Sequence, residues 1–194
     1  GSPAHPRRRI RPYEYPWGDA LMAALARSPS NKDAPSMKMY TARGDQGQTD
    51  LLGERVGKDD PRIDLLGELD ETTSTIGLGR AHAQVDGTRA ALFTVQHDLY
   101  LIMAELAFTD ATRPDAYRLP AERVAWLEEQ TDAVSATVTL PREFVVPGDT
   151  VPGAALDVAR TVARRAERVA VHLAQHGQIA NPEILRYLNR LSSL

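Results

Sequence analysis

The sequence contains no cysteine, and this absence excludes disulfide bonds, thiolate nucleophiles and cysteine-ligated metal sites together. It fits a cytoplasmic protein, since cytosolic chains rarely depend on disulfides. No apolar run reaches the roughly 18 residues that a membrane-spanning helix needs, so we expect no membrane partner. An excess of one charge is lacking too, because 23 Lys and Arg against 26 Asp and Glu leave a net charge of -3. No nucleic-acid partner is expected, and any site that binds an anion must consist of a local group of basic residues.

Length and composition predict one domain preceded by a tail. A chain of 194 residues is long enough for one well-buried core and short for two. Residues 28–36 are rich in Ser, Asn, Asp and Pro, which is typical of a linker. We therefore predict a flexible N-terminal arm and linker over residues 1–36 and a helical-bundle domain over residues 37–194.

Five segments of this domain have the spacing of amphipathic helices, with apolar residues recurring at steps of three and four. Asp-Pro and Asn-Pro pairs begin the first and the last of them. The residues expected on the buried faces are, helix by helix, Leu66, Leu69, Thr73, Ile76 and Arg80; Leu92, Val95, Leu99, Ile102 and Leu106; Val124, Leu127, Thr131 and Val134; Leu156, Ala159, Ala163, Ala166, Ala170 and Leu173; and Leu185, Leu188 and Leu191. The boundary residues expected are Asp60 and Pro61, Pro120, Gly177, and Asn181 and Pro182.

The remaining segments show no regular period. Residues 37–60 are rich in Gly and Asp, and we interpret them as a loop. Residues 144–146 are apolar and bracketed by prolines, which predicts an extended connector. Without convincing strands or a repeat of about 20–50 residues, the fold class predicted is all-α, a five-helix bundle with ferritin-like up-and-down packing.

The segment from Arg160 to Arg168 is the first candidate for chemistry. Arg160, Arg164 and Arg168 recur every four residues and share one face, with Arg165 beside them and Glu167 close by. A solvated face is the ordinary interpretation of such a charge run. The alanine-rich stripe next to it predicts instead that the helix packs against neighbours, and packed arginines need an anion, either a carboxylate or a polyphosphate.

The loop TARGDQGQT is the second candidate. Gly44 and Gly47 permit turns that other residues resist, and Thr41 and Thr49 add hydroxyl groups, so that successive N–H groups could surround an anion. A simple turn is the more common explanation of such a composition. The Walker A pattern is absent, so a nucleotide would have to bind in another way.

Six segments, in this order, decide between these interpretations: Tyr40 to Thr49, Lys58 to Arg62, Asp70 to Gly77, Phe144 to Gly148, Arg160 to Arg168 and Asn181 to Ser192. Together they resemble the signature of the PduO-type ATP:cob(I)alamin adenosyltransferases. The resemblance implies a five-helix bundle assembled as a homotrimer, with the active site between subunits. It also implies transfer of the 5′-deoxyadenosyl group of ATP to cob(I)alamin, with release of triphosphate.

The resemblance further implies roles for individual residues. The ATP-binding residues it implies are Thr41, Ala42, Arg43, Gly44, Asp45, Gly47, Gln48, Thr49, Lys58, Arg164, Arg165, Glu167, Arg168 and Asn189, with Glu167 orienting the arginines. The catalytic residues it implies are Asp70, Arg160, Arg164 and Phe144. Asp70 and Arg160 would form an ion pair at the subunit interface, and Phe144 would cover the lower face of the corrin.

The same resemblance implies the small molecules and partners of the protein. Mg²⁺ is expected with ATP, held mostly by phosphate oxygens and water rather than by protein ligands. The corrinoid would be cob(I)alamin, formed by reduction of cob(II)alamin. A reductase or an adenosylcobalamin-dependent enzyme would then be a protein partner.

Three alternatives stay open. The chain departs from the family pattern at Thr72, Thr73 and Ser193, which leaves room for an ATP-binding relative with altered corrinoid chemistry. A ferritin-type metal bundle needs Glu-x-x-His pairs, and none of the five histidines has a glutamate three residues before it; His172 and His176, one turn apart, are then surface residues. A non-catalytic helical interaction module would predict that replacing the helix arginines leaves ATP affinity unchanged.

Overall fold

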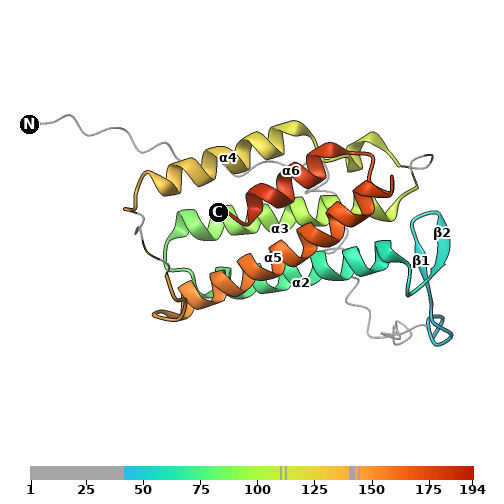
Figure 1. Ribbon diagram of the computed structural model, residues 1–194, viewed down its shortest axis with the longest axis horizontal. Helices are drawn as coiled ribbons and strands as arrows, with labels where there is room; N and C mark the ends of the chain where they lie inside the picture. Colours follow the sequence, from blue (N-terminus) through green and yellow to red (C-terminus); the bar gives the residue numbers. More distant parts are fainter. Residues whose placement is uncertain (1–41, 110, 112, 140–142, 144) are drawn as a thin grey trace, which may run out of the picture.

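The computed structural model describes residues 42–109, 111, 113–139, 143 and 145–194. Within them the chain forms five α-helices and one short 3-10 helix. Figure 1 shows that consecutive α-helices run in alternating directions along the long axis of the molecule. The helices are α2 (Pro61–His82), α3 (Asp86–Ala107), η1 (Asp115–Tyr117), α4 (Ala121–Ser135), α5 (Val151–Gln175) and α6 (Pro182–Leu191).

This architecture confirms the mostly helical fold with five helices. Ferritin-like packing and the homotrimer stay predictions, and the arm and linker predicted over residues 1–36 lie outside the described residues. In the part of the chain that the structure describes, no helix is both long and apolar enough to cross a membrane.

The segment before α2 was predicted to be a loop, and part of that prediction is wrong. Strands β1 (Gln48–Leu51) and β2 (Glu54–Gly57) pair antiparallel, from Gln48 opposite Gly57 to Leu51 opposite Glu54. Only two residues connect them, and the second, Gly53, has a φ of 120° that glycine adopts most readily. Strands of four residues are too short to show a clear alternation, which is why the pattern escaped detection.

The predicted helix boundaries are confirmed. The Asp60 carboxylate caps α2 by accepting a hydrogen bond from the Arg62 N–H at 2.9 Å. Hydrogen bonds from the Arg62 side chain also lower the pKa of Asp60. Asn181 caps α6 in the same way. At the end of α5, Gly177 has a φ of 72°, and the N–H of the next residue bonds back to the Leu173 carbonyl at 3.0 Å, as in a Schellman motif.

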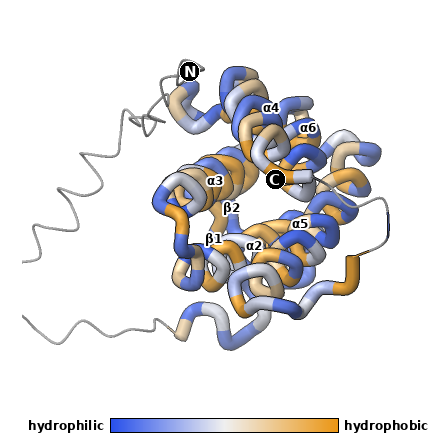
Figure 2. The backbone as a smooth tube through the Cα atoms, turned by 90° about the vertical axis from the view of Figure 1, so that its left-hand side faces the viewer, coloured by the Kyte–Doolittle hydropathy of each residue, from blue (hydrophilic) through white to orange (hydrophobic). Residues whose placement is uncertain are grey.

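The helices enclose one hydrophobic core, seen end-on in Figure 2, where α2 lies beside α5 and α4 lies beside α6. All five predicted positions of α3 are buried, as is the alanine stripe of α5. Four helices differ in part from the prediction, and on two of them the difference is one half-buried leucine, Leu156 on α5 and Leu185 on α6. On α2, Leu66 and Arg80 are only half-buried, because this helix packs against both α3 and α5 and buries a wider arc. On α4, Val134 is 48% exposed at the edge of an open groove.

Thr72 and Thr73, where the chain departs from the family pattern, occupy buried positions of α2. Their hydroxyl groups donate to the carbonyls of Glu68 and Leu69, at 2.7 and 2.9 Å. A threonine that bonds back to its own helix satisfies its polar group without a tertiary partner. The two residues are therefore compatible with the core.

At Gly79, the backbone of α2 lies close to the Leu156 side chain of α5. A Cβ atom at this position would lie 2.8 Å from Leu156 Cδ2, so we expect Gly79→Ala to lower the free energy of unfolding by about 1–3 kcal/mol. Gly67→Ala on the same helix is the matched control, because no atom lies within 4 Å of a Cβ there. Urea unfolding should show this control at or above wild-type stability, since alanine favours helix by up to about 1 kcal/mol. Equal losses in both variants would contradict the close contact.

Candidate functional site

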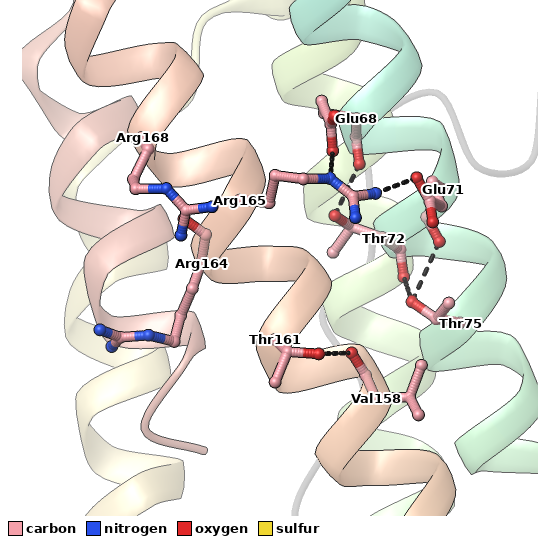
Figure 3. Close-up of polar contacts among 9 residues, drawn as sticks. All are labelled: Glu68, Glu71, Thr72, Thr75, Val158, Thr161, Arg164, Arg165 and Arg168. Carbon is pink, nitrogen blue, oxygen red and sulfur yellow. Dashed lines mark hydrogen bonds and ion pairs between the residues drawn. The ribbon is translucent and has the colours of Figure 1, made fainter.

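Arg165 joins α5 to α2. Its guanidinium donates to the carboxylates of Glu68, at 2.6 Å, and Glu71, from the side of α5 that faces α2 (Figure 3). The hydrogen bond to Glu68, and to a smaller extent the one to Glu71, raises the pKa of Arg165, so the guanidinium stays charged. Glu68 and Glu71 lie one turn apart on α2 and therefore point the same way. In this structure Arg165 braces two helices, and its expected role in ATP binding stays a prediction.

Arg164 and Arg168 are arranged differently from Arg165. Both side chains are exposed and extend away from α2 (Figure 3). Arg168 Nη1 donates to the Arg164 backbone carbonyl at 3.1 Å. Among the described residues, no acidic side chain forms an ion pair with either guanidinium. Two neighbouring guanidinium groups without an acidic partner in the described part of the chain are available to an anion, and their planar shape suits phosphate oxygens.

Asn189 extends this arginine face onto α6. Its side-chain amide donates to Glu167 Oε1 at 2.8 Å. The side-chain oxygen of Asn189 accepts a hydrogen bond from Arg190 Nη1 at 2.6 Å. Arg190 in turn pairs with Glu128 of α4 at 2.9 Å. Glu167 was expected to orient the arginines, and that role stays a prediction. In this structure Glu167 accepts the hydrogen bond from Asn189, because α6 packs against α5. Glu167 of α5 and Asn189 of α6, two of the predicted site residues, are thus in direct contact.

The catalytic residues expected on the corrinoid side are only partly described. Asp70 is exposed on α2. Arg160 pairs with Asp157, one turn earlier on α5, at 2.9 Å, and its side chain is 47% exposed. The expected pair between Asp70 and Arg160 belongs to a subunit interface and stays a prediction. Phe144 lies outside the described residues.

The glycine-rich loop folds against the hairpin. The Gly47 N–H donates to the Gly44 carbonyl at 3.1 Å, and the Gly47 carbonyl accepts from the Lys58 N–H at 2.8 Å. A Cβ at Gly44 would lie 3.0 Å from the Lys58 ammonium nitrogen, so the missing side chain leaves room for this cation. Both Ala42 and Gly47 have positive φ values, 56° and 75°. The loop therefore places the Lys58 ammonium group beside Gly44, and its expected role in phosphate binding stays a prediction.

The other loop residues take part in the hairpin itself. Arg55 donates to the Arg43 carbonyl at 2.7 Å and to the side chains of Gln48 and Asp50 at 3.0 and 2.8 Å. Thr49 is half-buried in β1, and Asp45 is exposed. Thr41 lies outside the described residues. The Arg43 carbonyl and the Gln48 side chain therefore support the loop in this structure, whereas Lys58 is exposed beside Gly44.

An apolar groove of about 740 Å³ lies at the end of the bundle away from the hairpin. It is formed by the first turns of α3 and α5, the last turn of α4 and the final residues of the chain. Arg160 and Asp157 line it together with Leu156, Leu92 and Val134. Its volume is in the range of small-molecule sites. Sequence reasoning missed it, because its walls come from distant segments.

Sequence reasoning also missed a buried polar network. Asp98 and Glu105 of α3 and Arg123 of α4 are at most 3% exposed. A signal was present, since Asp98 and Glu105 fall at the three- and four-residue steps of the apolar face of α3. Charged residues at such positions need buried partners.

No cluster of three or more His, Asp or Glu side chains that could hold a metal ion occurs within the described ranges. His172 and His176 are exposed, with ring centroids 4.3 Å apart. The His176 Nδ1 atom lies 2.7 Å from the His172 carbonyl. This pair alone lacks the third protein ligand that catalytic zinc sites usually have.

Residues 39–194 match the model of a family described as cobalamin adenosyltransferase. The chain is 40% identical over 160 residues to the corrinoid adenosyltransferase of Bacillus subtilis, covering 80% of this chain and 81% of that protein. It is 39% identical to the cobalamin adenosyltransferase of Cupriavidus metallidurans, covering 81% and 83%. To the corrinoid adenosyltransferase PduO of Salmonella typhimurium it is 36% identical, covering 80% of this chain and 47% of that protein.

The fold is similar to that of a solved relative. A variant of the PduO-type ATP:corrinoid adenosyltransferase of Lactobacillus reuteri, complexed with cobalamin and ATP, superposes with a TM-score of 0.72 at 34% identity. The match covers 80% of this chain and 86% of that one.

Proposed function

Because the chain belongs to the cobalamin adenosyltransferase family, we infer that it transfers the 5′-deoxyadenosyl group of ATP to cob(I)alamin. The Co(I) centre attacks C5′, a cobalt–carbon bond forms and the C5′–O bond breaks. The products are adenosylcobalamin and triphosphate. The observation that carries this proposal is the exposed pair Arg164 and Arg168 without an acidic partner among the described residues.

The leaving group explains why cations are needed. Triphosphate gains negative charge as the C5′–O bond breaks, so fixed donors at its oxygens lower the barrier. We propose that Arg164, Arg168 and Lys58 supply these donors and that the Asn189 amide completes the nucleotide site. Mg²⁺ would bind phosphate oxygens and water, which needs no dedicated cage of protein ligands.

The complete site is proposed to draw on two subunits of a homotrimer. Within one chain Lys58 directly follows the hairpin, whereas the groove beside Arg160 is lined by the first turns of α3 and α5. These turns lie at the other end of the bundle (Figure 1). A neighbouring subunit could bring these parts together. The exposed Asp70 carboxylate is then available to Arg160, whose present pair with Asp157 is half-exposed and therefore weak.

We propose that the corrinoid lies at the apolar groove, with Phe144 over its lower face. Phe144 belongs to the connector that leads into α5, and the first turns of α5 line this groove. An apolar surface there excludes a water ligand from cobalt and so favours the Co(I) state. A reductase that supplies the electron, an adenosylcobalamin-dependent enzyme that takes the product and a cytoplasmic location complete the proposal.

The reaction can be tested directly by anaerobic incubation with ATP and chemically reduced cobalamin. We expect the visible spectrum of adenosylcobalamin to appear, and triphosphate to form in equal amount. ATP binding without any spectral change would contradict the transfer reaction and support the alternative of an ATP-binding relative with altered corrinoid chemistry. A chain that binds neither substrate would favour the interaction module.

A further inference from the structure

Two carboxylates of α3 lie in the protein core and both contact α6. Asp98, which is 0% exposed, accepts a hydrogen bond from the Tyr187 hydroxyl at 2.7 Å. Glu105, which is 3% exposed, accepts from the Asn181 side-chain amide at 3.1 Å. The two carboxylates are seven residues apart and thus on one side of α3. Burying a charge is unfavourable unless it is paired, and Asp98 pairs with Arg123 at 2.7 Å while Glu105 pairs with Arg113 at 3.7 Å.

Arg123 determines where the Asp98 carboxylate lies. Its Nε and Nη2 atoms donate to the two oxygens of Asp98 at 2.8 and 2.7 Å. Its Cζ atom lies over the Trp126 ring, 4.4 Å from the ring centroid, which is a cation–π contact. A bidentate pair has little freedom of orientation. The Asp98 carboxylate, which accepts the hydrogen bond from Tyr187, is therefore held in place by α4 as well as by α3.

The hydroxyl of Tyr187 in turn restricts rotation of α6. This helix has only ten residues, and its other buried side chains, Ile184, Leu188 and Leu191, are aliphatic and make contacts without direction. Tyr187 and Asn189 are two residues apart and point to opposite sides. Side-chain tips lie roughly 5–6 Å from a helix axis. A rotation of roughly 20° would thus move the Asn189 amide by roughly 2 Å, which is enough to break its 2.8 Å bond to Glu167.

We propose that Tyr187 is a positioning residue of the ATP site, which holds Asn189 against Glu167 through its hydrogen bond to Asp98. The inference rests on the proposed nucleotide site and adds to it a residue that touches no substrate. The chain from Arg123 through Asp98 to Tyr187 joins three helices and ends at the helix that carries Asn189. Asn181, which donates to Glu105, caps the same helix by accepting a hydrogen bond from the Glu183 N–H.

The test is Tyr187→Phe, which removes one hydroxyl and keeps the ring. We expect the KM and the calorimetric Kd for ATP to rise roughly tenfold, since a displacement of about 1 Å can cost up to about 100-fold. The KM for cobalamin should change less than the KM for ATP, because α6 contributes only its last residue, Leu191, and the residues after it to the apolar groove. Asn189→Ala should raise the Kd for ATP similarly, and the double variant should be no worse than either single one.

Val95→Ala is the control, because it removes buried methyl groups from α3 and leaves the hydrogen bonds intact. It should lose stability with an unchanged Kd for ATP. Wild-type ATP affinity in Tyr187→Phe, or effects of Tyr187→Phe and Asn189→Ala that multiply, would overturn the inference even if the enzyme is active. A wild-type chain that binds ATP and forms no adenosylcobalamin would refute the proposed reaction, while the calorimetric comparison would still decide on Tyr187.

Discussion

Arg164→Ala is expected to reduce the turnover of ATP and cob(I)alamin by about 10²–10³-fold, equivalent to about 3 kcal/mol in the barrier. Arg164 is exposed, and no described acidic residue pairs with its guanidinium, so the charge is available to the leaving triphosphate. The effect should appear mainly in kcat, because phosphate charge develops most in the transition state. Anaerobic initial rates, followed by the spectrum of adenosylcobalamin, provide the measurement.

Two variants separate this role from general charge effects. Arg164→Lys keeps the charge and loses the planar fork, and we expect it to recover only part of the rate. Arg118→Ala removes an exposed arginine next to η1, outside the proposed site, and should leave the rate unchanged. If Arg164→Ala also kept the wild-type rate and ATP affinity, the nucleotide site would have to lie elsewhere, as the interaction-module alternative requires.

The second large effect concerns stability. Arg123→Ala leaves the Asp98 carboxylate in the core without its bidentate partner, and we expect a loss of about 3–5 kcal/mol in the free energy of unfolding. For a chain of this size that corresponds to a decrease in Tm of about 10 °C. Urea unfolding followed by circular dichroism measures the first quantity, and a thermal scan measures the second.

The control for this prediction is another arginine that connects two helices. Arg190 pairs with Glu128 across α6 and α4, but both side chains are more than 40% exposed. Arg190→Ala should therefore cost at most about 1 kcal/mol. Combining Arg123→Met with Asp98→Asn removes both charges and should recover much of the loss. Similar losses for Arg123→Ala and Arg190→Ala would show that burial does not govern the strength of these pairs.

Local signals predicted the helices well. Asp60, Asn181 and Gly177 mark helix ends because their preferences depend on neighbours within a few residues. All five positions that the apolar spacing of α3 predicted to be buried are buried. The hairpin was missed because its strands have four residues each and are held by pairing between strands.

For the segment from Arg160 to Arg168, the sequence did not predict which arginine contacts α2. Its periodicity indicated an anion site but could not separate Arg165 from Arg164, because both are charged and adjacent. The different roles of the two arginines depend on Glu68, which is 97 residues away from Arg165 in the chain. Only the packing of α2 against α5 brings that carboxylate to Arg165 and leaves Arg164 and Arg168 on the other side (Figure 3).

The sequence by itself determined the helical class, the helix ends and, through its ordered motifs, the family and the reaction. These properties follow from local preferences and from residue patterns that need no knowledge of which helices are neighbours. The tertiary structure decided which arginine braces α2, which residue Glu167 holds and how Arg123, Asp98 and Tyr187 connect three helices. The physical reason is that ion pairs and buried hydrogen bonds act over a few ångströms, and only the packed fold brings distant segments that close.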